Sequence, residues 1–276
     1  MIKEASGAIS KLQLVKWAFL FSQKKIINSF YQFVPYHHGP FSFNLYHEID
    51  SLKKHGYLTE QVNNTIALGE IKSGETLDFS IKKEINYFIT NIKKLSNDDL
   101  LNLVYCRYPW YTINARNKKL RADKRSEAKI AVYTAGYEGL QIDGFINLLL
   151  NSGIKQLIDV RAHPISRAYG FHKKTLSMIS NNLDIKYISI PELGVPNSWR
   201  RFLKESKNYK AVFNKYLDTI IEDQTESIDT VCSFTASQPS ALMCMESNPK
   251  RCHRSYLAKV IAENTDLDIH ELRKNE

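Results

Sequence analysis

The sequence lacks any long hydrophobic run. No stretch approaches the roughly 18 uninterrupted apolar residues that a membrane-spanning helix requires. The first residues, MIKEASGAISKL, also lack the basic, apolar and small-residue order of a secretory signal. We therefore expect a soluble, cytoplasmic protein with no membrane partner.

Glycine-rich nucleotide loops and paired cysteines are missing as well. Neither GxGxxG nor GxxxxGK[ST] occurs, which argues against dinucleotide-binding and P-loop NTPase folds. The four cysteines include no CxxC pair, so we expect free thiols rather than structural zinc or disulfides. The adjacent His37 and His38 have no carboxylate or thiol near them in sequence and are interpreted as turn residues. The sequence predicts no metal site and identifies no cofactor.

Positive charge is concentrated in the first half of the chain. Residues 1–128 hold 19 of the 38 Lys and Arg residues but only 12 of the 29 Asp and Glu residues. Much of the excess lies at 114–125, where few apolar residues could anchor a fold. We predict a boundary here, between a domain at 1–125 and a second at 129–276. The basic run itself could be a solvated connector or could contact phosphates.

The first half is predicted to be mainly helical and winged-helix-like. Leu12, Val15 and Phe19 share one helical face. Ser42 is placed to cap a second helix, and Gly56 is placed to end it. Two helices followed by an apolar, strand-like segment is the element order of a winged helix.

Two segments of this half, PYHHGPFSFNLYHEIDSLKKHGYL and LVYCRYPWYTINAR, resemble the winged-helix region of SocA- or Panacea-type antitoxin-related proteins. The resemblance covers roughly the first 120 residues and implies a role near toxin–antitoxin or phage-defence systems, with a protein or DNA partner. If the partner is DNA, the helix at 42–54 is expected in the major groove. The candidate nucleic-acid-binding residues are Lys53, Lys54, Arg116, Lys118, Lys119 and Arg121.

Strands and helices alternate in the second half. Apolar, strand-like runs at 130–134, 156–160, 186–190, 240–245 and 267–272 alternate with helical patterns at 142–150, 175–182 and 252–262. This order predicts an α/β fold, with a mostly parallel, Rossmann-like sheet and helices on both faces. In such a sheet the carboxyl ends of the strands lie at one edge, where ligands bind.

Polar residues follow the predicted strands and form a candidate site at that edge. The ligand-binding candidates are Gly136, Tyr137, Glu138, Glu192 and Asn248, and the catalytic candidates are Asp159, Arg161, Glu246, Cys252, His253 and Arg254. Several cations and carboxylates from separate loops at one edge favour an anionic small molecule or a nucleotide as ligand.

Cys252 lies among cations where a new helix is predicted to begin, at about Lys250 or Arg251. The positive end of that helix would lower the pKa of the thiol, so Cys252 could be a nucleophile. A C-x5-R phosphatase loop is absent, because Ala258 stands where its arginine would be.

Two other roles for Cys252 stay open. The thiol could pack inward as a small apolar group while His253 and Arg254 pair with nearby carboxylates. Alternatively, Cys244, Cys252 and His253 could hold a metal, although the C-x7-C-H spacing is unusual for such a site.

Four blocks of this half, TAGYEG, IDVRAHPISR, IPELG and MCMESNPKRCHRSYLA, resemble in order the signature blocks of the domain-of-unknown-function 488 family. The resemblance covers about residues 130–272, and Ala135 stands where a larger aliphatic residue is common. It implies no reaction. The motif positions that it carries over are Gly136, Asp159, Arg161, Pro164, Glu192, Gly194, Cys244, Glu246, Pro249, Cys252, His253 and Arg254.

The sequence therefore predicts a two-domain protein that acts on or near nucleic acid, with a nucleotide- or phosphate-binding site at the strand ends. Catalysis there would use Arg161 and Arg254 to clamp phosphate and His253 or Glu246 to transfer protons. Whether the protein is an enzyme stays open. The alternatives are a DNA-binding regulator and a protein-interaction module of a toxin–antitoxin or phage-defence assembly.

Overall fold

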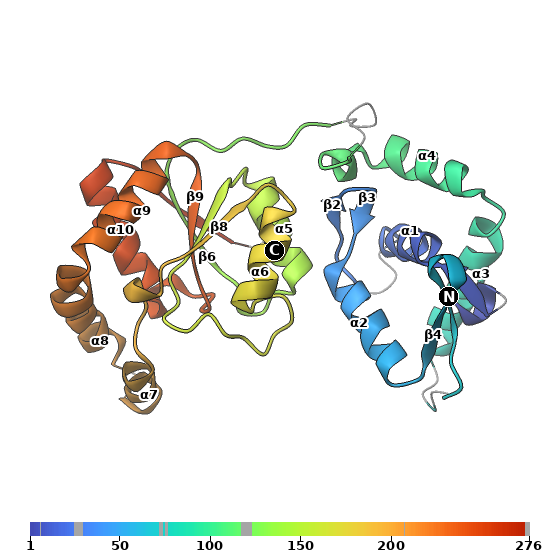
Figure 1. Ribbon diagram of the computed structural model, residues 1–276, viewed down its shortest axis with the longest axis horizontal. Helices are drawn as coiled ribbons and strands as arrows, with labels where there is room; N and C mark the ends of the chain where they lie inside the picture. Colours follow the sequence, from blue (N-terminus) through green and yellow to red (C-terminus); the bar gives the residue numbers. More distant parts are fainter. Residues whose placement is uncertain are drawn as a thin grey trace. The chain divides into compact units, whose positions relative to one another are not determined.

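The chain folds into two compact units, which comprise Met1–Lys124 and Arg125–Glu276. The computed structural model describes residues 1–5, 7–24, 30–71, 74, 77–116, 123–206 and 208–273. Figure 1 shows the first unit in blue to green and the second in green to red. The division falls at the end of the basic run 114–125. No helix among the described residues is long and apolar enough to cross a membrane.

The first unit is mainly helical, with two small antiparallel sheets. One sheet has the strand order β1-β5-β4, and the other is the hairpin β2-β3. Its elements are η1 (Lys3–Ala5), β1 (Ala8–Ser10), α1 (Lys11–Ser22), β2 (Val34–Tyr36), β3 (Gly39–Phe41), α2 (Phe43–Lys54), β4 (Leu58–Gln61), η2 (Val62–Asn64), β5 (Thr65–Leu68), α3 (Phe79–Ile92), α4 (Asn97–Arg107) and η3 (Pro109–Thr112).

The predicted signals around α2 are confirmed. The Ser42 side chain accepts a hydrogen bond from the Leu45 N–H at 3.2 Å, and Gly56 follows the helix with a φ of +77°. Between α1 and α2, however, the chain forms the hairpin β2-β3, so that Gly39 begins a strand. Helices α3 and α4, which the sequence reasoning missed, begin at capping residues Asp78 and Ser96. The winged-helix interpretation of this unit stays a prediction.

A lysine is buried in the first unit. Lys16 on α1 is 2% exposed, and its ammonium donates hydrogen bonds to the carbonyls of His38 and Pro40, at 2.5 and 3.1 Å. Burial lowers the pKa of Lys16 from 10.5 to about 7. Between these two pH values the unfolded chain therefore binds one proton that the folded chain has released.

We expect this difference to make the stability of the first unit depend on pH. Because the unfolded state binds more protons, the free energy of unfolding should rise by about 1.4 kcal/mol per pH unit above about pH 7 and level off near pH 10.5. The Lys16→Met variant should lack this rise. Urea titrations at several pH values between these limits measure it. An equal slope in both proteins would contradict the prediction.

The second unit is built on five parallel strands in the order β10-β6-β9-β7-β8, which confirms the predicted α/β class and parallel sheet. Its elements are β6 (Val132–Gly136), α5 (Ile142–Asn151), β7 (Gln156–Asp159), α6 (Lys173–Asn181), β8 (Lys186–Ser189), η5 (Pro191–Leu193), α7 (Asn197–Ser206), α8 (Tyr209–Tyr216), η6 (Leu217–Ile221), α9 (Thr225–Ser237), β9 (Ser240–Cys244), η7 (Pro249–Arg251), α10 (Arg254–Thr265) and β10 (Ile269–Leu272).

Helices cover both faces of this sheet. Figure 1 shows α5 and α6 on one face and α9 and α10 on the other. Leu242 packs into the core on the α9–α10 face, together with Ile158. Side chains alternate along a strand, so Cys244 also points to the α9–α10 face, whereas Asp159 points to the α5–α6 face. The register places Gly136 beside Cys244 and Asp159 beside Met243, so these strand ends share one edge.

The last predicted helix begins later than expected. The residues Pro249–Arg251 form a 3-10 turn, which the Asn248 side chain caps by accepting from the Lys250 N–H at 3.0 Å. Cys252 is extended, and α10 begins only at Arg254. The sequence reasoning also missed the three helices α7, α8 and α9 between β8 and β9.

Candidate functional site

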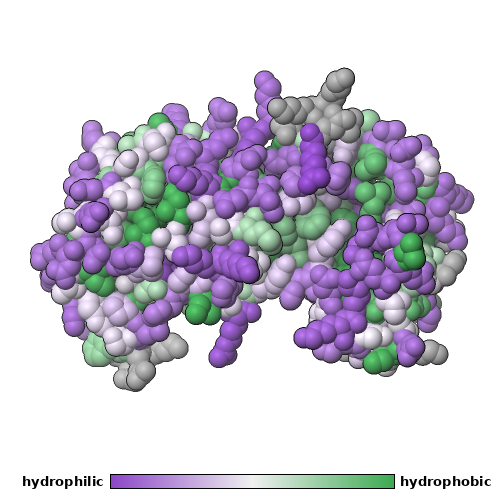
Figure 2. Space-filling model, in the orientation of Figure 1, coloured by the Kyte–Doolittle hydropathy of each residue, from purple (hydrophilic) through white to green (hydrophobic). Residues whose placement is uncertain are grey.

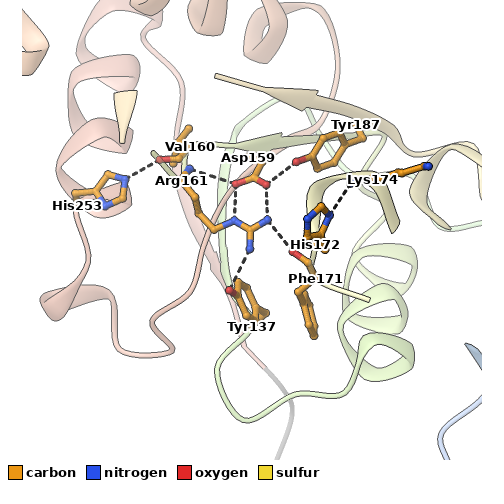
Figure 3. A network of polar contacts seen from close by, with 9 residues as sticks. All are labelled: Tyr137, Asp159, Val160, Arg161, Phe171, His172, Lys174, Tyr187 and His253. Atoms are coloured by element: carbon orange, nitrogen blue, oxygen red, sulfur yellow. Dashed lines mark hydrogen bonds and ion pairs between the residues drawn. The ribbon is translucent and has the colours of Figure 1, made fainter. Parts of the chain in front are cut away.

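Six of the predicted site residues fall into two clusters, which lie on opposite faces of the sheet at its carboxyl edge. On the α5–α6 face lies the arginine cluster, which comprises Tyr137, Asp159, Arg161, Phe171 and Tyr187. On the α9–α10 face lies the thiol cluster, which comprises Cys244, Glu246, Cys252 and His253. Figure 3 shows the arginine cluster and its connection to His253 through the Val160 carbonyl, which lies 2.9 Å from His253 Nε2.

A buried ion pair forms the centre of the arginine cluster. Arg161 Nε and Nη2 donate to the two Asp159 oxygens at 2.8 and 2.6 Å, and both side chains are almost fully buried. The Tyr187 hydroxyl donates to Asp159 Oδ2 at 2.6 Å, and burial together with the Asp159 carboxylate raises the pKa of Tyr187. The two hydrogen bonds of this bidentate pair fix the orientation of the guanidinium relative to the carboxylate.

Arg161 also anchors the segment that follows β7. Its guanidinium donates to the Tyr137 hydroxyl and to the Phe171 carbonyl, each at 3.0 Å, and the Tyr137 ring stacks on the Phe171 ring at 4.2 Å. Protein groups thus occupy most of the guanidinium donors. Arg161 therefore holds Tyr137 and the backbone at Phe171 in place. A phosphate contact by Arg161 stays a prediction.

The thiol cluster lies at the end of β9. Cys244, Cys252 and His253 are buried, and one ligand atom from each lies within 4.8 Å of the others. Cys244 Sγ is 3.2 Å from Glu246 Oε2 and 3.9 Å from His253 Nδ1. The Tyr216 ring packs edge-on against the imidazole at 5.4 Å. Thiol, carboxylate and imidazole groups at these distances can share protons or bind a soft metal ion.

The acidic thiol of this cluster is Cys244. A hydrogen bond from Cys252 lowers the pKa of Cys244 well below 9, against the effect of burial, and His253 lowers it further. Burial raises the pKa of Cys252, and Cys244 adds to that shift. The predicted low pKa of Cys252 is therefore wrong. The physical reason is that Cys252 is buried and extended, two residues before α10 begins.

The other two members of the thiol cluster also have shifted pKa values. Burial raises the pKa of Glu246, and Cys244 raises it further. Burial lowers the pKa of His253, but Cys244 and the Val160 carbonyl reverse that effect, and the net shift is upward.

Residues 141–261 match the family model described as Domain of unknown function DUF488. The match supports the resemblance of the second half and includes all four residues of the thiol cluster, together with Asp159 and Arg161. No match supports the SocA- or Panacea-like resemblance of the first half. No curated protein and no solved structure matches the chain.

Arg254, within the DUF488 match, is fully buried and bonds to the backbone. Its Nη1 donates to the Glu246 carbonyl and its Nη2 to the Ser247 carbonyl at 3.4 Å. Gly136 permits this packing, because a Cβ there would lie 2.0 Å from the Glu246 carbonyl oxygen. Glu138 accepts two bonds from Ser247 at 3.0 Å, which lowers the pKa of Glu138. Gly136, Glu138 and Arg254 thus hold the loop after β9.

The remaining candidates lie outside both clusters. Glu192 is exposed in η5, and Asn248 caps η7. In the first unit Lys53 forms ion pairs with Asp50 and Glu60, at 2.8 and 2.7 Å. Lys54 and Arg116 are exposed, whereas Lys118, Lys119 and Arg121 lie outside the described residues.

Two groups were missing from the predicted site. Cys244 was considered as a motif position and as one of three possible metal ligands, but it was not among the predicted site residues. The cations that follow Arg161 were also missed. Their signal is the absence of Asp and Glu from residues 160–183.

Proposed function

We propose that the second unit binds nucleic acid through the phosphate backbone. The contact surface is the cationic segment, which we define as residues 163–174. It carries His163, Arg167, His172, Lys173 and Lys174 and contains no acidic residue. All five side chains are exposed. The observation that carries the proposal is this group of exposed cations beside the carboxyl edge of a parallel sheet, where ligands commonly bind.

The cations of the segment have no carboxylate partner in the part of the chain that the structure describes. Within the described ranges, Arg167, Lys173 and Lys174 form no ion pair with a carboxylate. Lys53 of the first unit differs, because Asp50 and Glu60 neutralise it. Exposed cations that have no carboxylate partner are available to phosphates.

The backbone of the segment is held in place. Arg161 donates to the Phe171 carbonyl, and the Lys173 N–H donates to the Pro164 carbonyl at 2.9 Å. Lys173 and Lys174 form the first turn of α6, whose positive dipole end adds to their charge. A loop that is ordered before binding loses less conformational entropy when a ligand arrives. Figure 2 shows hydrophilic side chains over much of the visible face.

Salt-dependent binding tests the proposal. We expect fluorescence anisotropy with a labelled oligonucleotide of random sequence to show affinity that falls linearly with log salt. Because each lost phosphate contact reduces the slope by about 0.7 to 0.9, K173Q/K174Q should lower the affinity and reduce the slope by about 1.5. The matched control K129Q/K259Q removes two exposed cations elsewhere in the unit and should bind like the wild type.

Two results would overturn the proposal. One is undetectable binding at low salt, and the other is an equal loss of affinity in the control variant. A mononucleotide competitor separates a nucleic acid from a small anion, since both offer phosphate. If the mononucleotide displaces the oligonucleotide at equal concentration, the ligand is a nucleotide.

A further inference from the structure

Four metal-ligating side chains meet at the carboxyl end of β9. The ligand atoms of Cys244, Cys252 and His253 lie within 4.8 Å of one another, and Glu246 Oε2 is 3.2 Å from Cys244 Sγ. In a tetrahedral zinc site with ordinary bond lengths, neighbouring ligand atoms lie about 3.3 to 3.8 Å apart. The observed 3.2 and 3.9 Å distances from Cys244 fall close to that spacing. Cys244, Cys252 and His253 form the compact part of the set, and Glu246 lies at its edge, next to Cys244.

The imidazole is oriented as in a metal site. Because a carbonyl oxygen can only accept, the 2.9 Å contact with Val160 requires the proton on His253 Nε2. Nδ1, which faces Cys244, then keeps its lone pair in the neutral ring. Metal-binding histidines almost always donate their other ring N–H to a carbonyl or carboxylate in this way. The tautomer that the fold selects is therefore the one that a metal needs.

The buried charges would balance around a divalent cation. Two thiolates, one carboxylate and one divalent cation together carry a single net negative charge. Arg254 is fully buried beside this cluster and, among the described residues, forms no ion pair with a carboxylate. A buried cation is costly without a compensating anion. A metal complex with one negative charge would supply that anion.

The spacing in sequence is consistent with such a site once the fold is considered. Cys244 ends a strand, whereas Cys252 and His253 follow a 3-10 turn that returns the chain to the same point. The seven residues between the cysteines therefore span a loop and a turn rather than one compact zinc knuckle. Gly136 and Glu138 hold that loop from the neighbouring strand.

We infer that Cys244, Cys252, His253 and Glu246 form a zinc site that stabilises the second unit. Two thiolates, one imidazole and one carboxylate are a donor set that suits zinc among the divalent ions. The three buried ligands indicate a closed, structural site. The inference does not rest on nucleic-acid binding, because the cationic segment lies on other elements and K173Q/K174Q should retain zinc.

Metal analysis of the full-length protein tests the inference. Protein purified under reducing conditions without chelator should contain about one zinc per chain. C244S and C252S should each reduce the content at least tenfold, whereas C106S and C232S, which alter cysteines outside the cluster, should not. E246Q should weaken zinc binding at least tenfold, and an unchanged affinity would overturn the assignment of Glu246.

A second measurement covers variants that fail to fold. Cobalt added to the chelator-treated wild-type protein should give thiolate charge-transfer bands and the intense visible bands of a tetrahedral complex. The chelator should also lower the melting temperature, and zinc should restore it. Absence of both zinc and cobalt binding, with two freely alkylated thiols or a Cys244–Cys252 disulfide, would overturn the inference.

Discussion

Asp159→Asn is expected to destabilise the second unit by about 3 to 5 kcal/mol, the typical cost of removing one partner from a buried ion pair. The substitution keeps the size of the side chain but leaves the Arg161 guanidinium without its counter-charge. Arginine cannot release its proton to escape this cost. The Tyr187 hydroxyl also loses an ionised acceptor at 2.6 Å. The expected effect is therefore large for a substitution of one atom.

Amide hydrogen exchange of peptides from β6, β7 and β9 measures this loss within the second unit. Tyr187→Phe is the matched control, because it removes one hydrogen bond to Asp159 and leaves the ion pair intact, at a cost of about 1.5 to 3 kcal/mol. The double variant Asp159→Leu/Arg161→Met should be more stable than the sum of the single changes predicts. Unchanged exchange in Asp159→Asn would show that the pair does not support the fold.

Gly136→Ala is expected to cost about 3 kcal/mol and to disturb the thiol cluster. The new Cβ would lie 2.0 Å from the Glu246 carbonyl oxygen and 2.7 Å from its carbon. The obstacle is backbone, which cannot rotate away like a side chain, so the loop after β9 must move. That loop carries Glu246 and bonds to Arg254. We therefore expect both lower stability and lower zinc content.

Gly139→Ala separates this collision from ordinary backbone strain. Gly139 has a φ of +78°, but no atom of the described residues lies within 4 Å of its added Cβ. Only the conformational cost of about 1 kcal/mol applies there. Thermal unfolding and metal content of the two variants measure the difference. Equal effects of the two substitutions would contradict the steric explanation.

The common edge of the sheet could be predicted from the sequence, but the division into two clusters could not. Near-continuous apolar strands indicate a parallel sheet, and every strand then ends at one edge. The face on which a side chain lies depends on register and on strand order. Here β9 lies between β6 and β7, and Asp159 and Cys244 point to opposite faces. Neither strand order nor register follows from apolar runs alone.

Local electrostatics were misjudged where a helix boundary was misplaced. The expected acidity of Cys252 depended on a helix start at Lys250 or Arg251, but Pro249 begins a 3-10 turn and α10 starts at Arg254. Because the helix starts three or four residues later than predicted, Cys252 lies before its first turn and is buried in the protein core. Helix α7 was missed because its sequence, NSWRRFLKES, contains few apolar residues.

The bond between Val160 and His253 joins residues 93 positions apart in the chain. The imidazole therefore takes its orientation from a neighbouring strand that the Cys-x-Glu and Cys-His-Arg signature does not contain. Transferring these residues into another parallel sheet would reproduce the ligand side chains but not the Val160 carbonyl, which holds the proton on His253 Nε2. A designed copy of the site must therefore include β7 as well as β9.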